Sequence, residues 1–178
     1  MNKIYFTSDL HFGHANIIRF CNRPYENVEE MDRALIENWN SVIDKDDTVY
    51  VLGDVFFCKF NDALKIMDQL NGHKNLVYGN HDKVIRNNDI LQKRFSLILD
   101  DLDEITIDNH KVILCHYPMW SWNQASRGSI QLHGHIHSNE PVQPDKRQYD
   151  VGVDNNNYFP VSWDDIKKKM LVIELLAF

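Results

Sequence analysis

The stretch Thr7–Ala15, TSDLHFGHA, comes directly after the short apolar run Ile4–Phe6. In α/β proteins, functional side chains gather in the loops after strands, because the sheet fixes their position while the loop exposes them. Asp9 and His11 would point the same way from an extended backbone, since side chains alternate with a period of two residues. A D-x-H pair could therefore bind one cation. Three residues taken alone are more often a solvated turn, so the rest of the chain has to decide.

The length and composition of the chain predict a single domain over residues 1–178. Its 178 residues are 43% hydrophobic and 25% charged, and no long polar or Pro/Gly/Ser-rich linker divides them. The first residues, MNKIYF, do not resemble a signal peptide, and no run of about 18 apolar residues occurs that could span a bilayer. We therefore expect a cytoplasmic protein without a membrane partner.

Charge and cysteine usage exclude several classes of function. The formal net charge of −7 disfavours a broad electrostatic surface for duplex DNA or acidic lipid. The three cysteines, Cys21, Cys58 and Cys115, are widely spaced and form no C-x-x-C motif. This pattern argues against both a disulfide framework and a thiolate zinc site.

Strands and helices alternate along the predicted chain. Asn27 has the form of a helix N-cap with Glu30 three residues on, and apolar residues then recur at helical spacing over 28–42. A second helix is predicted over 61–70. Strands are predicted over 48–52, 75–78 and 130–132, and a hairpin over 105–107 and 112–115. The tail at 164–178, DDIKKKMLVIELLAF, suits a helix or, in its final apolar run, a strand.

Five of the predicted strands end in side chains that commonly bind metals. These side chains are Asp9 and His11, Asp54, Asn80 and His81, His116, and His135 and His137. Parallel strands present their carboxyl ends along one edge, so residues distant in sequence would converge in one crevice. Imidazole, carboxylate and carboxamide without thiolate suit Mn, Fe, Zn or Ni. Without His81, seven ligands remain, which are too many for one tetrahedral zinc and about right for two divalent ions that share a carboxylate.

The sequence resembles the calcineurin-like metallophosphoesterases. The resemblance rests on five motif blocks in order between residues 9 and 137: D-x-H at 9–11, G-D at 53–54, G-N-H-D at 79–82, a histidine before an aromatic at 116–117, and G-H-x-H at 134–137. It implies an α/β fold, a four-layer αββα sandwich in which two mixed β-sheets pack face to face and are flanked by helices. The blocks leave no room for a cap domain, so we expect an open, shallow site.

The resemblance also implies a role for each motif residue. The metal ligands would be Asp9, His11 and His137 for one ion, Asn80, His116 and His135 for the other, and Asp54 as the bridge between them. His81 would be the general acid, with Asp82 available to orient it. Two such cations would hold a bridging hydroxide for in-line attack on phosphorus, while His81 protonates the leaving oxygen. Asn80 taken alone could equally be a turn residue.

A further set of residues could contact the substrate, although surface or packing roles are the more common ones for such residues. These are His14, Arg19, Arg23 and Arg127, whose rings or guanidinium groups could reach a phosphate. Trp120 and Trp122 could stack a nucleobase or an aromatic leaving group. His73, His110 and His133 have no motif partner and are expected to be solvated or packed. After Asp54 the chain continues apolar as VFFC, where many relatives carry a second acid, so this wall of the site should be apolar.

Three functions are compatible with these motifs. The preferred one is a dinuclear metal-dependent phosphoesterase for small phosphomonoesters or phosphodiesters, cyclic nucleotides included. The second is a nuclease of the same superfamily, which the acidic charge and the lack of a basic stripe disfavour. The third is a non-catalytic protein-binding scaffold, which would be free to lose ligands that this chain retains. The sequence leaves the natural substrate, the metals and the oligomeric state open.

Overall fold

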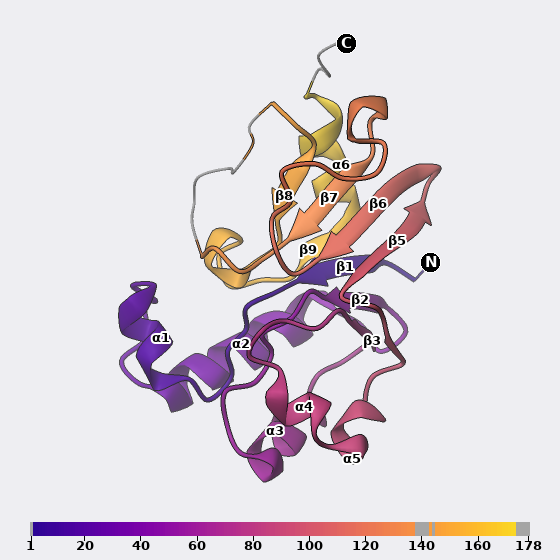
Figure 1. The fold of residues 1–178 in the computed structure, drawn as a ribbon. Helices are drawn as coiled ribbons and strands as arrows, with labels where there is room; N and C mark the ends of the chain where they lie inside the picture. The colour runs from indigo at the N-terminus through magenta and orange to yellow at the C-terminus, as the bar shows by residue number, and fades with distance from the viewer. Residues whose placement is uncertain (1, 138–142, 144, 174–178) are drawn as a thin grey trace.

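The computed structural model describes residues 2–137, 143 and 145–173. Two β-sheets lie side by side, with helices against them (Figure 1). The strands of the first sheet are β1 (Ile4–Thr7), β2 (Thr48–Val51), β3 (His73–Leu76), β4 (Leu97–Ile98) and β9 (Val161–Ser162). Those of the second are β5 (Leu102–Ile107), β6 (His110–Cys115), β7 (Ile130–His133) and β8 (Gln148–Asp150). The α-helices are α1 (Ala15–Phe20), α2 (Val28–Val42), α3 (Phe60–Met67), α4 (Lys83–Arg86), α5 (Asp89–Gln92) and α6 (Trp163–Leu171).

Both sheets are mixed. In the first, the order is β4-β3-β2-β1-β9, with β1 to β4 parallel and β9 antiparallel to β1. In the second, the order is β5-β6-β7-β8, with only β5 antiparallel to its neighbour. The carboxyl ends of β1, β2 and β3 therefore meet along one edge, and those of β6 and β7 along another. The predicted α/β fold with two mixed sheets and flanking helices is confirmed.

Helix α2 covers the outer face of the first sheet. Met31, Leu35 and Trp39 recur on one side of the helix and are almost fully buried in the cluster that includes Val49 and Val51 of β2. The Asn27 side chain accepts a hydrogen bond from the Glu30 N–H at 2.9 Å, which satisfies one of the free donors at the helix start. The predicted helix and its cap are confirmed.

A second apolar cluster joins the two sheets. Phe6 and Leu52 from the first sheet meet Val112, Leu114 and Leu132 from the second in this cluster. The buried face of α6 contributes Ile166 and Met170 to the same cluster. Apolar side chains from both sheets thus keep the two sets of strand ends in a fixed relation.

The opposite face of β7 is covered mainly by the loop that follows β6. Gln131 points away from the shared cluster, and its side chain donates to the Tyr117 carbonyl at 3.2 Å. Trp122, in the same loop, is 7% exposed, and its indole N–H donates to Ser129. A short 3-10 helix at Ala125–Arg127 is the helical part of this loop.

The other predicted elements agree with the structure apart from their bounds. The helix predicted at 61–70 is α3, which ends at Met67, and the strand predicted at 75–78 is β3, which begins at His73. The tail forms helix α6 as far as Leu171, and residues 174–178, where a strand was the alternative, lie outside the described part. No helix within the described ranges is long and apolar enough to cross a membrane. The single domain over 1–178 stays a prediction.

Candidate metal centre

The predicted ligands converge in two groups at the ends of five strands. Asp9, His11 and His137 offer ligand atoms that all lie within 4.8 Å of one another. The ligand atoms of a second group, Asp54, His116 and His135, also all lie within 4.8 Å of one another. The side chains come from the loops after β1, β2, β6 and β7, and they lie together because both sheets end their parallel strands here.

Asp54 belongs to the second group and also approaches the first. Its Oδ2 atom is 3.6 Å from His11 Nε2 and 3.6 Å from His116 Nε2. A single carboxylate oxygen equally distant from an imidazole of each group has the position of a bridging ligand. Asn80, from the loop after β3, places its Oδ1 atom 3.0 Å from His116 Nε2 and so lies with the second group.

The hydrogen bonds of two histidines leave a lone pair directed at the centre. His116 Nδ1 lies 2.7 Å from the Leu52 carbonyl oxygen, which can only accept, so Nδ1 donates and Nε2 keeps its lone pair. His137 Nδ1 lies 2.7 Å from Asp154 Oδ2 in the same way, and its Nε2 is 3.8 Å from Asp9 Oδ1. Histidines that bind a metal through one ring nitrogen usually donate the N–H of the other nitrogen to a carboxylate or a carbonyl, and this hydrogen bond fixes the tautomer.

Several buried polar atoms of the centre have no hydrogen-bond partner among residues 2–137, 143 and 145–173. Asp9 Oδ1 and both ring nitrogens of His11 are such atoms, although the two residues are only 1% and 2% exposed. His116 Nε2 also faces Asn80 Oδ1 at 3.0 Å, which brings two acceptors together. Buried acceptors without donors are costly, and a cation between them removes that cost. The donor set therefore fits a metal centre.

At His137 burial lowers the pKa, but the hydrogen bond with Asp154 and the charge of Asp9 outweigh burial and raise it. Burial favours the neutral form, which metal binding requires, at two other ligands. It lowers the pKa of His11 to about 2, and the charges of His137 and Arg23 act in the same direction. Burial also lowers the pKa of His135. The pKa of Asp9 is raised to about 6 by burial, against the opposing effect of His137 and His116. A nearby cation would favour the ionised form of this carboxyl.

The backbone at the centre adopts an uncommon conformation. Five of the seven predicted ligands have a positive φ: Asp9 (58°), His11 (51°), Asp54 (55°), His135 (75°) and His137 (47°). Residues other than glycine rarely adopt this left-handed region, and such strain clusters at functional sites. Two motif glycines make room for the ligands, because a Cβ at Gly79 would collide with the Asp54 carboxylate and one at Gly134 with Asp9.

His81 and Asp82 lie beside the centre with different roles. The His81 ring is exposed, with its centroid 5.7 Å from that of His11, and its backbone N–H donates to Asp54 Oδ1 at 2.8 Å. The expectation that Asp82 orients His81 is wrong. The buried Asp82 carboxylate instead accepts backbone N–H bonds from Gly79, Asp54 and Val55 at 2.7 to 2.9 Å, and it thereby ties the loops after β2 and β3 together.

The predicted role of Arg23 as a phosphate ligand is also wrong. Its side chain is fully buried and donates to the backbone carbonyls of Asp9 and Leu10 and to both carboxylate oxygens of Asp154. Its remaining Nη1 donor faces Met31 Sδ at 3.5 Å, so every donor of this guanidinium has a partner among the described residues and none is left to face a substrate. Arg19 and Arg127 are exposed, on α1 and in the 3-10 helix after β6, and no described contact joins either to the ligands.

The other aromatic candidates divide between the core, the surface and the centre. The His14 ring stacks on Phe57 at a centroid distance of 3.9 Å and lies 5.4 Å from the His11 ring. Trp122 is buried in the loop described above and cannot act as a stacking platform, whereas Trp120 is 82% exposed. Of the histidines without a motif partner, His133 is buried with Nδ1 2.9 Å from the Gly134 carbonyl, while His73 is exposed and His110 half-buried.

Two acids that support the centre were not predicted from the sequence. Asp154 accepts from His137 and Arg23, and Asp32 accepts from the Gly13 N–H at 3.0 and 3.1 Å. Neither acid lies in a motif, so a single sequence carries no signal for them. Cys21 also approaches His137 and Asp154. Burial and the Asp154 charge raise the pKa of this thiol to about 11, which makes it a weak competitor for metal.

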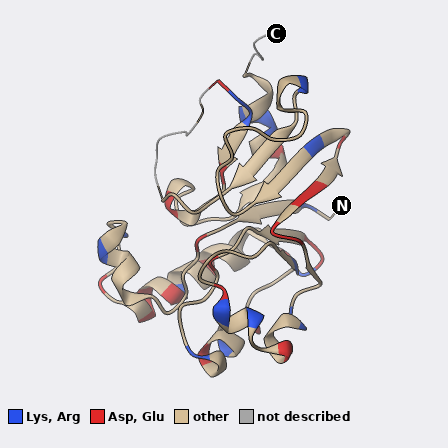
Figure 2. Ribbon diagram, viewed as in Figure 1, with Lys and Arg blue, Asp and Glu red and all other residues tan. Residues whose placement is uncertain are grey.

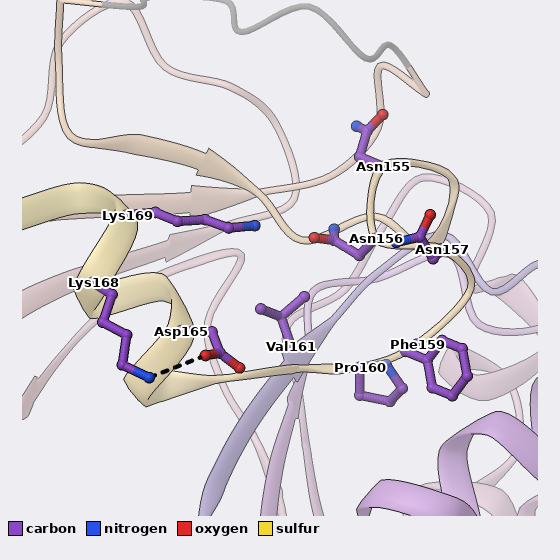
Figure 3. Close-up of a pocket in the computed structure, with 9 residues that line it drawn as sticks. All are labelled: Asn155, Asn156, Asn157, Phe159, Pro160, Val161, Asp165, Lys168 and Lys169. Atoms are coloured by element: carbon purple, nitrogen blue, oxygen red, sulfur yellow. Dashed lines mark ion pairs between the residues drawn. The ribbon is translucent and has the colours of Figure 1, made fainter.

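A separate cavity of about 380 Å³ lies between α6 and the 155–161 segment (Figure 3). It is lined by Asn155, Asn156, Asn157, Phe159, Pro160, Val161, Asp165, Lys168 and Lys169. Lys168 forms an ion pair with Asp165 at 3.5 Å, and Lys169 donates to the Tyr149 hydroxyl. None of the predicted ligands lines this cavity, so the candidate site is the cluster at the strand ends.

Comparisons with known proteins identify the family. An uncharacterised protein of Methanocaldococcus jannaschii is 39% identical over 175 residues, which cover 94% of this chain and 91% of that protein. The gene 66 protein of Mycobacterium phage L5 is 29% identical over 182 residues, with 86% and 87% covered. The structure of a protein of unknown function from Aquifex aeolicus matches with a TM-score of 0.76 and 28% identity, over 95% of this chain and all of that one. The model of the calcineurin-like phosphoesterase superfamily domain matches residues 2–150, so this chain belongs to that superfamily.

Proposed function

We propose that the chain is a dinuclear metal-dependent phosphoesterase that hydrolyses small phosphomonoesters or phosphodiesters, cyclic nucleotides included. The observation that carries the proposal is the position of Asp54 Oδ2, 3.6 Å from an imidazole nitrogen of each ligand group. Two groups of imidazoles and carboxylates around one shared oxygen suit two ions of Mn, Fe, Zn or Ni.

The chain's own residues divide the work in this proposal. Asp9, His11 and His137 would hold one cation, Asn80, His116 and His135 would hold the other, and Asp54 would be shared by the two sites. The bound cations would activate a water and neutralise charge on the phosphoryl oxygens. The exposed ring of His81 lies next to this centre, where it can donate a proton to the leaving oxygen.

Two alternative functions receive less support. Figure 2 shows Lys and Arg interspersed with Asp and Glu on both halves of the described chain, with no continuous basic stripe for a nucleic acid. Buried acceptors without donors and five ligand positions with a left-handed backbone both lower the stability of the fold. A non-catalytic scaffold would gain nothing in return for this loss.

The test is a panel of phosphoesters assayed after metal removal and again with Mn, Fe, Zn, Ni or Mg added. The panel holds phosphomonoesters, phosphodiesters, 2′,3′- and 3′,5′-cyclic nucleotides and single-stranded DNA. We expect hydrolysis of small esters with a transition metal, and none in EDTA. A preference for DNA over every small ester would favour the nuclease, and no hydrolysis by a metal-loaded protein would favour the scaffold.

A further inference from the structure

Three neighbouring rings form an exposed surface beside the metal centre. Phe57 and His14 are stacked with centroids 3.9 Å apart, and Phe20 lies 6.4 Å from His14 in an edge-on arrangement. Phe57 is 46% exposed and Phe20 is 63% exposed. We call Phe20, His14 and Phe57 the aromatic wall. Large apolar side chains exposed next to a polar site are typical of a ligand-binding surface.

The wall adjoins the proposed general acid. The ring centroid of Phe57 is 5.5 Å from that of His81, and His81 and His14 each lie within 6 Å of the metal ligand His11. A general acid must lie within hydrogen-bond reach of the leaving oxygen. The group attached to that oxygen therefore projects from the centre on the side where Phe57 is exposed.

The tryptophans of the loop after β6 do not offer an equivalent surface. Trp122 is buried, and the Trp120 ring is contacted by the Lys146 ammonium at 5.2 Å without a described contact to any predicted ligand. Tyr117 is 45% exposed and packs on the ring of His135, but no described ring contact joins it to His81. Among the described aromatic rings, the wall therefore offers the exposed π-surface that adjoins His81, on which a ring of the substrate can stack. Stacking on such faces tolerates different rings, because every aromatic ring has a π-face.

We propose that the aromatic wall binds a flat aryl or heteroaryl ring carried by the leaving group, with Phe57 as the main specificity-determining residue. The substrate class is then phosphoesters of ring-bearing alcohols. This inference rests on the proposed function, because it places the ring relative to His81. It goes beyond that function by selecting among the small esters that an open metal site could accept.

The first experiment compares two diesters whose leaving alcohols have similar acidity. Methyl phenyl phosphate carries a flat ring, and methyl hexafluoroisopropyl phosphate carries none. The metal-loaded wild type should have a kcat/KM about 5- to 100-fold higher for the phenyl ester, mainly through KM. Phe57→Leu should remove most of this preference with unchanged metal content. Phe57→Tyr keeps the ring and should retain it, and Trp120→Leu is the control at a distant exposed aromatic.

A binding measurement provides a readout independent of turnover. Phenylphosphonate and cyclohexylphosphonate have similar size, but only the first is flat. Calorimetry on the metal-loaded protein should show tighter binding of phenylphosphonate, and Phe57→Leu should abolish the difference. Hydrolysis of both esters without ring preference, or an equal loss for both in Phe57→Leu, would overturn this inference alone. If neither ester nor any other ester of the panel is hydrolysed, the proposed function fails, and this inference fails with it.

Discussion

Arg23 and Asp154 form a buried two-point ion pair that connects the loops of two predicted metal ligands, Asp9 and His137. The Arg23 Nε and Nη2 atoms donate to the two Asp154 carboxylate oxygens, each at 2.8 Å. Arg23 Nη2 also donates to the Asp9 carbonyl at 2.7 Å, and Asp154 Oδ2 accepts from His137 Nδ1 at 2.7 Å. The pair therefore fixes both the loop of Asp9 and the ring of His137, although these ligands lie at opposite ends of the motif region.

We expect Asp154→Asn to weaken one metal site without removing the other. The amide keeps the shape but loses the charge that holds His137, and loss of such supporting partners typically lowers metal affinity by about 10- to 100-fold. Calorimetric titration with Mn should then show one weakened site of two. Asp47→Asn is the matched control, since Asp47 is also buried but accepts from the Lys3 and Asp44 N–H groups, and no described contact joins it to the predicted ligands. Equal effects of the two variants would contradict this role.

Asp54→Asn should damage both metal sites at once. The amide nitrogen of asparagine is not a metal ligand, so only one oxygen remains for binding. The negative charge that both cations would share is also lost. His11→Ala and His116→Ala should each chiefly weaken one site, because the two histidines belong to different ligand groups, although the Nε2 atom of each is 3.6 Å from Asp54 Oδ2. Elemental analysis after dialysis measures the metal content. Three equally mild losses would argue against a shared carboxylate.

Metal binding should raise the melting temperature of the metal-free protein. Buried acceptors such as Asp9 Oδ1 and the unprotonated ring nitrogen of His11 would gain a cation that the unfolded chain cannot hold in the same geometry. A ligand present at 100 times its Kd stabilises the folded state by about 2.7 kcal/mol. Differential scanning calorimetry with Mn and then with excess EDTA tests this, and an unchanged transition would favour the scaffold function.

His81→Ala should lose turnover while keeping its metals. The backbone N–H of residue 81, which donates to Asp54, remains in this variant, so the ligand geometry is preserved. Esters with alkoxide leaving groups should slow by about 10²- to 10⁴-fold, whereas p-nitrophenyl esters, whose leaving group needs no proton, should slow much less. If both substrates slow by the same factor, His81 is not the acid, and His14 becomes the next candidate.

Asp32 should make the stability of the metal-free protein fall between about pH 4 and pH 6. Burial raises the pKa of Asp32 to about 6 from 3.8, so ionisation opposes folding. Its contribution is fully present below pH 3.8, is lost as the pH rises to 6 and stays lost above. Asp32→Asn should thus be about 1 kcal/mol more stable relative to wild type at pH 7 than at pH 4, after allowance for solvent screening.

Thermal unfolding of the wild type and Asp32→Asn at both pH values measures this difference. The side-chain oxygen of the introduced asparagine can still accept from the Gly13 N–H, so the hydrogen bond seen in the structure need not be lost. Glu37→Gln, an exposed acid on the same helix, is the control. Parallel stability curves for wild type and Asp32→Asn would show that this carboxyl does not titrate as expected.

The predictions from sequence succeeded where local pattern and backbone geometry determine the outcome. The spacing of Met31, Leu35 and Trp39 defines one buried helix face, and alternating strands and helices place Asp9 and Asp54 at neighbouring strand ends. These features depend on periodicity and on parallel strand pairing, both of which a single sequence records.

The roles of Arg23 and Asp82 could not be predicted in the same way. Arg23 is close in sequence to the first motif, but its partner Asp154 lies after β8, and a pairing over that distance leaves no local pattern. Asp82 follows His81 directly, yet its carboxylate turns inward to three backbone amides. Which partner a polar side chain reaches is decided by tertiary packing, and adjacency in a motif does not determine it.

The left-handed backbone of the ligand residues places the metal centre in conflict with the stability of the fold. At each of these positions glycine would adopt the same backbone at less cost, so a glycine at position 137 would relax the loop but delete an imidazole. Selection for stability alone would therefore erode the ligands one by one. A homologue that no longer binds metal should carry glycine or asparagine at these positions while the two sheets remain intact. The left-handed backbone conformation would then be kept in a protein without a metal site.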